Sequence, residues 1–175
     1  MARISYVEPD QAPPDVKDIY DKFFRGKPGN AQKVLAQRPE LLKNFLSFYS
    51  CVARGLDRKL YESIYIRVSM MNGCRYCMQH HVAASKRAGL TADDWTALKS
   101  GDYSRYGEKE RVALQYAEKL TRSSRDVNEE DFIELKKHFS DAEILDIHLL
   151  TGLVNLTNRF TDPLGLELEI PEEKV

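Results

Sequence analysis

Apolar residues recur along most of this chain at intervals of three and four positions, the spacing that places side chains on one face of an α-helix. No segment shows a convincing β-strand pattern. We therefore expect an all-α fold, a single-domain helical bundle of about eight helices. The helices are expected at about residues 13–25, 31–53, 57–71, 74–87, 91–98, 108–122, 128–139 and 140–156.

Several helix boundaries follow from side chains that begin or end helices. Asp57 and Ser140 can accept hydrogen bonds from the first free backbone N–H groups of a helix, so both are expected as N-caps. Pro39 is expected to divide the helical region 31–53, because proline removes a backbone hydrogen bond and clashes with the preceding turn. The Asn72-Gly73 pair is expected to end one helix and turn the chain toward the next.

The length of 175 residues favours one domain with a short segment at either end. We expect an N-terminal arm and first helix over residues 1–30, a helical domain over residues 31–160, and an irregular acidic tail over residues 161–175. The last expected helix, residues 140–156, is apolar around most of its circumference. Such a helix either lies in the centre of the core or is shared with a partner subunit, which favours a homo-oligomer.

The charge pattern narrows the classes of partner. The net charge is −1, and basic residues stand beside acidic ones, as in Glu108-Lys109-Glu110-Arg111. This mixing is typical of a solvated helix surface and argues against nucleic-acid binding, which needs a concentrated basic face. No apolar run approaches the ~18 residues of a membrane span, and the N-terminus lacks the apolar stretch of a secretory signal. We therefore expect a cytoplasmic protein that does not bind membranes.

Three cysteines, Cys51, Cys74 and Cys77, give an odd count that argues against a secreted disulfide scaffold. In a reducing compartment, the close pair Cys74 and Cys77 is more often catalytic or metal-binding than structural. Cys51 shares the apolar pattern of Phe45 and Phe48, so we expect it in the core.

The close pair forms part of a larger constellation. Cys74, Cys77 and His81 are spaced i, i+3 and i+7, which places them on one face of a helix. Cys74 is expected at the helix N-terminus, where free N–H groups and the helix dipole favour the reactive thiolate. The spacing also lets the two sulfur atoms form a disulfide within one turn.

Glu62 lies on the preceding helix. If the Asn72-Gly73 turn makes the two helices antiparallel, Glu62 falls level with about residue 83 and within reach of His81. A carboxylate that orients an imidazole beside a thiol is a recurring arrangement for activating a nucleophile. The expected order is therefore Glu62 to His81 to Cys77, with Cys74 one turn away.

This pattern of Glu62, Cys74-x-x-Cys77 and His81 resembles the alkylhydroperoxidase D group of the carboxymuconolactone decarboxylase superfamily. The helical order is also similar over about residues 35–160. The resemblance implies an alkylhydroperoxidase D-like helical fold and a thiol-dependent peroxidase that reduces organic hydroperoxides through a Cys74–Cys77 redox disulfide. It implies that Cys77 is peroxidatic, that Cys74 is resolving, and that Glu62 and His81 relay protons with the help of a water molecule.

The resemblance implies no bound cofactor and no metal. It implies a small-molecule hydroperoxide as substrate, an external dithiol such as a thioredoxin-like or lipoyl protein as reductant, and a homo-oligomer, either a trimer or a hexamer. In one respect the chain departs from the group, because Tyr76 stands where the best-known members have a second histidine. Tyrosine cannot act as a base near neutral pH.

Two other functions stay open at the level of the sequence. One is a carboxymuconolactone decarboxylase-like lyase, although those members generally lack the cysteine pair. The other is a zinc-stabilised helical interaction module, in which Cys74, Cys77 and His81 bind the metal together with Glu62 or His148. The helix-terminus argument also favours Cys74 as the more acidic thiol, whereas the resemblance assigns the attack to Cys77.

Overall fold

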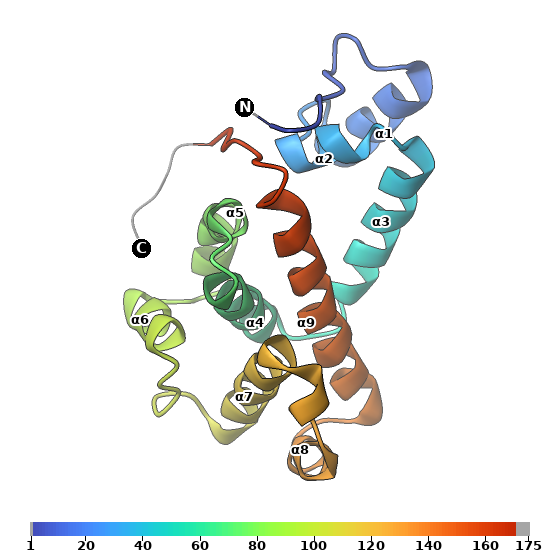
Figure 1. Ribbon diagram of the computed structural model, residues 1–175. Coiled ribbons are helices and arrows are strands. Elements are labelled where there is room, and N and C mark those ends of the chain that lie inside the picture. The colour runs from blue at the N-terminus through green and yellow to red at the C-terminus, as the bar shows by residue number, and fades with distance from the viewer. Residues whose placement is uncertain (1, 171–175) are drawn as a thin grey trace.

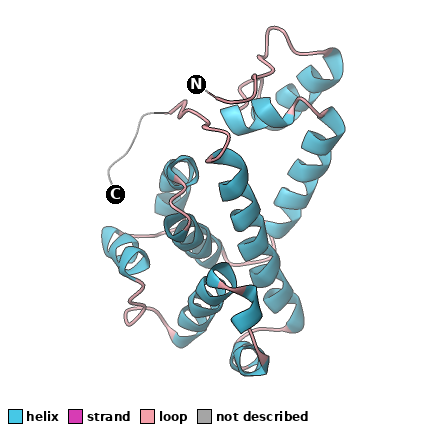
Figure 2. Cartoon of the chain, viewed as in Figure 1, coloured by secondary structure: helices cyan, strands magenta, loops and turns pink. Residues whose placement is uncertain are grey.

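The computed structural model describes residues 2–170, and within that range it contains nine α-helices, one short 3₁₀ helix and no strand (Figures 1 and 2). The predicted all-α class is confirmed. The last five residues of the expected acidic tail, 171–175, lie outside the described residues. The elements are α1 (Pro14–Phe24), α2 (Asn30–Leu35), α3 (Pro39–Val52), α4 (Arg58–Met71), α5 (Arg75–Arg87), α6 (Ala92–Ser100), α7 (Glu108–Arg122), η1 (Ser124–Asp126), α8 (Glu129–Lys136) and α9 (Asp141–Thr161).

The helices begin where the sequence predicts. Pro39 is the first residue of α3 and separates it from α2, which is why the described part of the chain has one helix more than expected. The Asp57 carboxylate accepts hydrogen bonds from two backbone N–H groups at the start of α4, at 2.9 and 3.2 Å. Ser140 caps α9, and Glu143 completes a capping box there.

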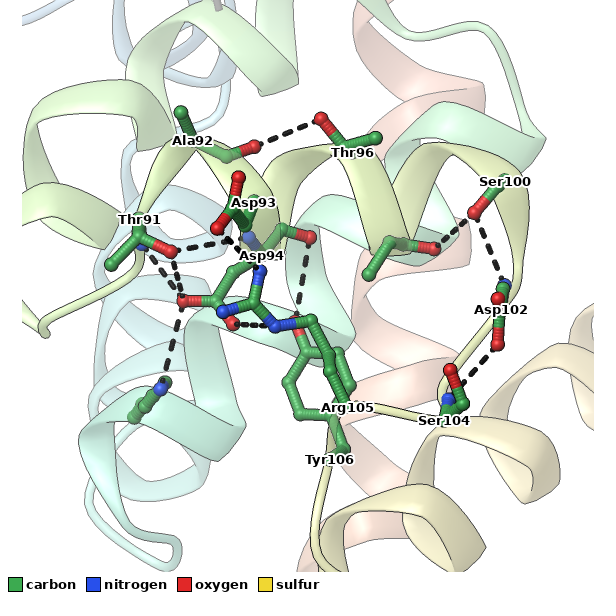
Figure 3. Close-up of polar contacts among 12 residues, drawn as sticks. Thr91, Ala92, Asp93, Asp94, Thr96, Ser100, Asp102, Ser104, Arg105 and Tyr106 are labelled. Atoms are coloured by element: carbon green, nitrogen blue, oxygen red, sulfur yellow. Dashed lines mark hydrogen bonds and ion pairs between the residues drawn. The ribbon is translucent and has the colours of Figure 1, made fainter.

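A polar cluster around Asp94 fixes α6 to the rest of the molecule (Figure 3). The Asp94 carboxylate accepts hydrogen bonds from the backbone and hydroxyl groups of Thr91, at 2.8 and 2.9 Å, which closes a capping box. Arg105 and Lys59 lie 3.5 and 3.6 Å from the same carboxylate, and Tyr106 donates to the Asp94 backbone carbonyl. Burial raises the pKa of Asp94, but its bonds to Thr91 and Lys59 outweigh this effect and lower it. The cluster therefore connects α4, α6 and the loop that follows α6.

The main hydrophobic core surrounds α4, which is buried over residues 60–69 and packs against α5, α7 and α9. The long helix α9 buries Ile147, Leu150 and Val154 against this core. On its other side, Leu145 and Leu156 are 56% and 55% exposed. The central position therefore belongs to α4, and α9 presents an apolar stripe outward.

A second, smaller core lies where α1, α2 and the first half of α3 meet. Its buried members are Val16, Ile19, Tyr20, Ala36 and Leu42. The segment that precedes α1 meets the segment that follows α9 beside this unit, where the Arg3 backbone N–H donates to the Leu164 carbonyl at 2.9 Å (Figure 1). The N-terminal segment and the segment after α9 therefore lie side by side.

The expectation that Cys51 belongs to the core is wrong. The Cys51 side chain is exposed, with its sulfur 3.7 Å from the Arg54 guanidinium, and Phe48 is also largely exposed. Cys51 comes nine residues after Leu42, and at about 100° per residue this places the two on opposite sides of α3. Because Leu42 faces the small core, Cys51 faces outward.

Candidate active site

The site is built on the hairpin of α4 and α5. Asn72 ends α4, and Gly73 has φ +70°, a left-handed conformation that glycine adopts without strain. Cys74 is the N-cap of α5, as expected, and its backbone N–H donates to the Ser69 carbonyl at 2.9 Å. The Asn72 side chain donates to Asn158 of α9 at 2.9 Å, which holds the turn against that helix.

Cys74 and Cys77 are joined by a disulfide, with their Cα atoms 5.4 Å apart. Both side chains are buried, and the Cys77 backbone N–H points at the Cys74 sulfur at 3.2 Å. The hydroxyl of Thr161, the last residue of α9, lies 3.1 and 3.3 Å from the two sulfur atoms. Since Thr161 donates its proton to the Thr157 carbonyl, its oxygen is available as an acceptor for a thiol.

Glu62 and His81 form the contact that the hairpin predicts. The Glu62 Oε2 atom lies 2.7 Å from His81 Nδ1, and its other oxygen lies 2.6 Å from the Arg58 guanidinium. Glu62 is fully buried. A carboxylate only accepts hydrogen bonds, so this contact places the imidazole proton on Nδ1 and leaves Nε2 as an acceptor.

Two tyrosines surround His81 that the sequence did not single out for the site. The Tyr65 ring, which the sequence interprets as helix packing, stacks on the imidazole with centroids 3.5 Å apart. The Tyr49 hydroxyl lies 3.4 Å from Nε2 and accepts a hydrogen bond from Tyr61 at 3.1 Å. Burial raises the pKa values of Tyr49 and Tyr65 well above the usual value, so both phenols stay protonated.

A cavity of about 280 Å³ adjoins these groups. Cys77 and His81 border it, whereas Cys74 lies behind them in the core. Among the described residues that border the cavity, none is Asp, Glu, Lys or Arg. The wall consists of Phe24, Ala31, Gln32, Leu35, Phe45, Leu46, Tyr49, Tyr65, Tyr76, Cys77, His80, His81, Thr157, Phe160 and Thr161.

The structure thus brings all four candidate residues into one region, with one difference from the expected order. His81 contacts Glu62 as predicted, but its Nε2 atom faces Tyr49 and not the Cys77 sulfur. Cys77 and His81 both border the cavity. Thr161 and Tyr49 complete the surroundings of the sulfur atoms and of the imidazole.

Tyr76, the residue that departs from the resembled group, joins three parts of the chain at the edge of the cavity. Its hydroxyl donates to Glu169 at 2.9 Å and accepts from the Ala31 backbone N–H at 3.1 Å. Glu169 also accepts from the Asn30 backbone N–H, and His80 lies 3.4 Å away. Burial raises the pKa of Glu169, but the bonds from His80, Asn30 and Tyr76 outweigh it and lower the pKa to about 2.

The remaining sequence-based candidates lie elsewhere. The side chain of His148 lies at the surface and bonds to the Tyr116 hydroxyl at 2.6 Å, so it does not belong to the core of this chain or to the cysteine region. Within residues 2–170, no group of three or more His, Cys, Asp and Glu side chains is arranged to hold a metal ion. In the same range, no helix has both the length and the apolarity to cross a membrane.

Residues 39–119, which include all four candidate residues, match the sequence profile of the carboxymuconolactone decarboxylase family. The fold is similar to the crystal structure of an uncharacterized peroxidase-related protein from Silicibacter sp. TM1040. The TM-score is 0.81 at 27% identity, over 95% of this chain and 91% of that chain. The profile match and the similarity of fold together support an alkylhydroperoxidase D-like member of the carboxymuconolactone decarboxylase superfamily.

Two further proteins are similar to this alkylhydroperoxidase D-like chain. One is the alkylhydroperoxidase AhpD core of an uncharacterized peroxidase-related protein from Ralstonia eutropha JMP134. It has a TM-score of 0.80 and 26% identity, over 95% of this chain and 91% of that chain. The other is the uncharacterized protein YdfG of Bacillus subtilis (strain 168), 29% identical over 113 residues, which are 63% of this chain and 77% of the relative.

Proposed function

We propose that the protein is a thiol-dependent peroxidase that reduces organic hydroperoxides through the Cys74–Cys77 disulfide. One observation carries the proposal. The disulfide places Cys77 on the wall of an apolar cavity that also contains His81, and Glu62 orients that imidazole. The similarity to proteins described as peroxidase-related supports the same activity.

The proposed cycle has three steps. The Cys77 thiolate attacks one oxygen of the hydroperoxide, the O–O bond breaks, and a Cys77 sulfenic acid and an alkoxide form, which leaves as the alcohol after protonation. The Cys74 thiolate then attacks the Cys77 sulfur and displaces hydroxide, which leaves as water. Finally an external dithiol supplies two electrons and two protons and restores both thiols.

The surroundings of the sulfur atoms support this division of roles. Cys77 borders the cavity, so a substrate can reach its sulfur, whereas Cys74 is shielded from it. The Cys74 sulfur accepts a hydrogen bond from the Cys77 backbone N–H at the N-terminus of α5, and this favours the thiolate form of Cys74. That thiolate suits a resolving cysteine, which must attack the sulfenic acid. The helix-terminus effect and the attack by Cys77 are therefore compatible.

The cavity wall favours a neutral, largely apolar substrate. Phe24, Leu35, Phe45, Leu46 and Phe160 supply most of its apolar surface, and it is large enough for a small organic molecule. An alkyl or aryl hydroperoxide fits this chemistry. As reductant we propose a thioredoxin-like or lipoyl dithiol, which must approach the disulfide from the cavity side.

We further propose that the protein works as a homo-oligomer in the cytoplasm. The apolar stripe of α9, with Leu145 and Leu156 exposed, supports association through that helix. A trimer or a hexamer would bury this stripe, and sedimentation velocity would measure which of them forms.

Thiol counting by intact mass tests the peroxidase activity. The reduced protein is treated briefly with a slight excess of cumene hydroperoxide, then denatured and alkylated. We expect two of the three thiols to become unavailable and to return after treatment with a dithiol. Cys74→Ser, which keeps only Cys51 and Cys77, should lose one thiol, because its Cys77 stops at the sulfenic acid and cannot form the disulfide. Cys51 serves as an internal control, because it is outside the site and stays alkylatable. Three alkylatable thiols after peroxide treatment would overturn the proposal.

A further inference from the structure

Tyr49 completes an ordered chain of hydrogen bonds that ends at the buried carboxylate of Glu62. The Tyr61 hydroxyl donates to the Tyr49 hydroxyl at 3.1 Å, and Tyr49 lies 3.4 Å from His81 Nε2. His81 Nδ1 lies 2.7 Å from Glu62. Because Glu62 fixes the imidazole proton on Nδ1, Nε2 must accept. Tyr49 accepts a hydrogen bond from the Tyr61 hydroxyl, so the Tyr49 proton points to Nε2. Every hydrogen-bond donor in the chain therefore points toward Glu62.

The hydroxyl of Tyr49 differs from that of Tyr65, the other tyrosine next to the imidazole. Tyr65 bonds to the Thr157 hydroxyl at 3.2 Å, and Thr157 donates its own proton to the Val154 carbonyl. Thr157 is therefore an acceptor for the Tyr65 hydroxyl, which also interacts with the Tyr49 hydroxyl but not with an imidazole nitrogen. Tyr49, by contrast, bonds to the nitrogen whose protonation changes if His81 acts as a base, and it borders the cavity with Cys77.

We propose that Tyr49 is a catalytic residue whose hydroxyl protonates the alkoxide that leaves when Cys77 attacks the hydroperoxide. This inference rests on the proposed peroxidase function. It assigns the proton of the leaving group to Tyr49 and assigns to His81 the role of replacing that proton.

The protons balance over the step. His81 takes the proton of the Cys77 thiol at Nε2 and becomes an imidazolium, which the Glu62 carboxylate stabilises. Nε2–H now donates to the Tyr49 oxygen, so the Tyr49 proton is released toward the cavity. When the O–O bond breaks, the alkoxide takes the Tyr49 proton while Nε2–H passes to the Tyr49 oxygen. The thiol and the hydroperoxide have become a sulfenic acid and an alcohol, and Tyr49 and His81 are both neutral again.

The burial of Tyr49 determines how the proton transfer to the alkoxide proceeds. Burial raises the pKa of Tyr49, so a free phenolate is disfavoured and the two proton transfers must be concerted. An alkoxide is a far stronger base than a phenolate, so the transfer to the leaving oxygen is favourable. A carboxylate leaving group is a weak base and needs no proton at all.

That difference in leaving groups provides the test. Tyr49→Phe keeps the ring and removes the hydroxyl, and the oxidation of the reduced protein is followed in single turnover with cumene hydroperoxide and with peroxybenzoic acid. We expect the rate with cumene hydroperoxide to fall by ~10²-fold, a typical loss for a general acid, and the rate with peroxybenzoic acid to fall by at most a few-fold. An equal loss with both oxidants, or no loss with cumene hydroperoxide, would overturn the proposal.

Tyr65→Phe is the matched control, because it removes a second buried hydroxyl beside the same imidazole. Its rates with the two oxidants should change by the same factor. A measurement on the unmodified protein adds an independent readout, since the solvent deuterium isotope effect is expected to be larger with cumene hydroperoxide than with peroxybenzoic acid, whose leaving group takes no proton from Tyr49. Oxidation of the unmodified protein by neither oxidant would refute the peroxidase function itself, whereas oxidation without the leaving-group dependence would refute only the role of Tyr49.

Discussion

Glu62 and His81 come from the two arms of one helical hairpin, and their Oε2 and Nδ1 atoms lie 2.7 Å apart. Arg58, one turn before Glu62, lies 2.6 Å from the other carboxylate oxygen. The carboxylate is thus buried with a partner on each side. This arrangement leaves Nε2 of His81 free to accept a proton. The contribution of the Glu62 charge can be tested by replacing the carboxylate with an uncharged amide.

Replacing Glu62 by glutamine should slow the oxidation of the cysteine pair by ~10²-fold, in the range typical of lost general base catalysis. The amide has nearly the same shape but no charge, so it neither stabilises an imidazolium nor holds the imidazole proton on Nδ1. Stopped-flow oxidation by cumene hydroperoxide measures the rate. Glu110→Gln, a half-buried carboxylate on α7 that does not border the cavity, is the matched control and should keep the original rate. An unchanged rate in Glu62→Gln would contradict the role of the carboxylate.

The two cysteines should differ in what their serine variants can do. Cys74→Ser should consume one equivalent of hydroperoxide and stop at a sulfenic acid on Cys77, because the resolving thiol is absent. Cys77→Ser should consume none, because Cys74 is shielded from the cavity. Trapping with dimedone followed by peptide mass spectrometry locates the sulfenic acid. If the label appears on Cys74 in the Cys77→Ser protein, the two roles must be exchanged.

The buried ion pair of Arg67 and Glu118 should contribute strongly to stability. Arg67 Nε donates to Glu118 Oε1 at 2.5 Å, and the Tyr103 hydroxyl donates to the same oxygen. Glu118→Ala leaves the buried guanidinium without its counter-charge, so the free energy of unfolding should fall by about 3–5 kcal/mol. Arg122→Ala removes only the exposed partner of Glu118 and should cost less than about 1 kcal/mol. Urea unfolding of the two variants checks the contrast.

Glu169 should make a stability contribution that depends on pH. Its pKa in the folded protein is about 2, below the usual value near 4.5, so the contribution is present above about pH 4.5 and is lost as the pH falls toward 2. Because the group is partly exposed, its contribution is about 1–2 kcal/mol. Urea unfolding of Glu169→Gln and the unmodified protein should therefore differ most at pH 7, and the difference should shrink steadily as the pH is lowered from about 4.5 toward 2. Glu134→Gln, on the exposed surface of α8, is the control and should show no such convergence.

The hairpin could be predicted from the sequence because its determinants are local. The Asn72-Gly73 turn and the spacing of Cys74, Cys77 and His81 lie within ten residues, and the antiparallel arrangement then fixes the level of Glu62. These features depend on backbone geometry and side-chain direction, which short stretches of sequence determine.

Tyr49 and Thr161 could not be predicted, since they reach the site only through tertiary packing. Tyr49 comes from α3 and Thr161 from the end of α9, and nothing near either residue in the sequence differs from ordinary helix packing. The error at Cys51 has a related cause. Apolar residues occur on several sides of α3, so its periodicity predicts a helix but not which side faces the core.

The wall of the cavity draws on both hydrophobic cores. Phe24, Leu35 and Leu46 pack with the small core of α1 to α3, whereas Cys77 and Tyr65 belong to the main core around α4. Substitutions in the small core can therefore reshape the pocket while the α4–α5 hairpin keeps its geometry. Single substitutions in the small core can therefore change ligand preference during evolution while the cysteine pair and its surroundings stay the same.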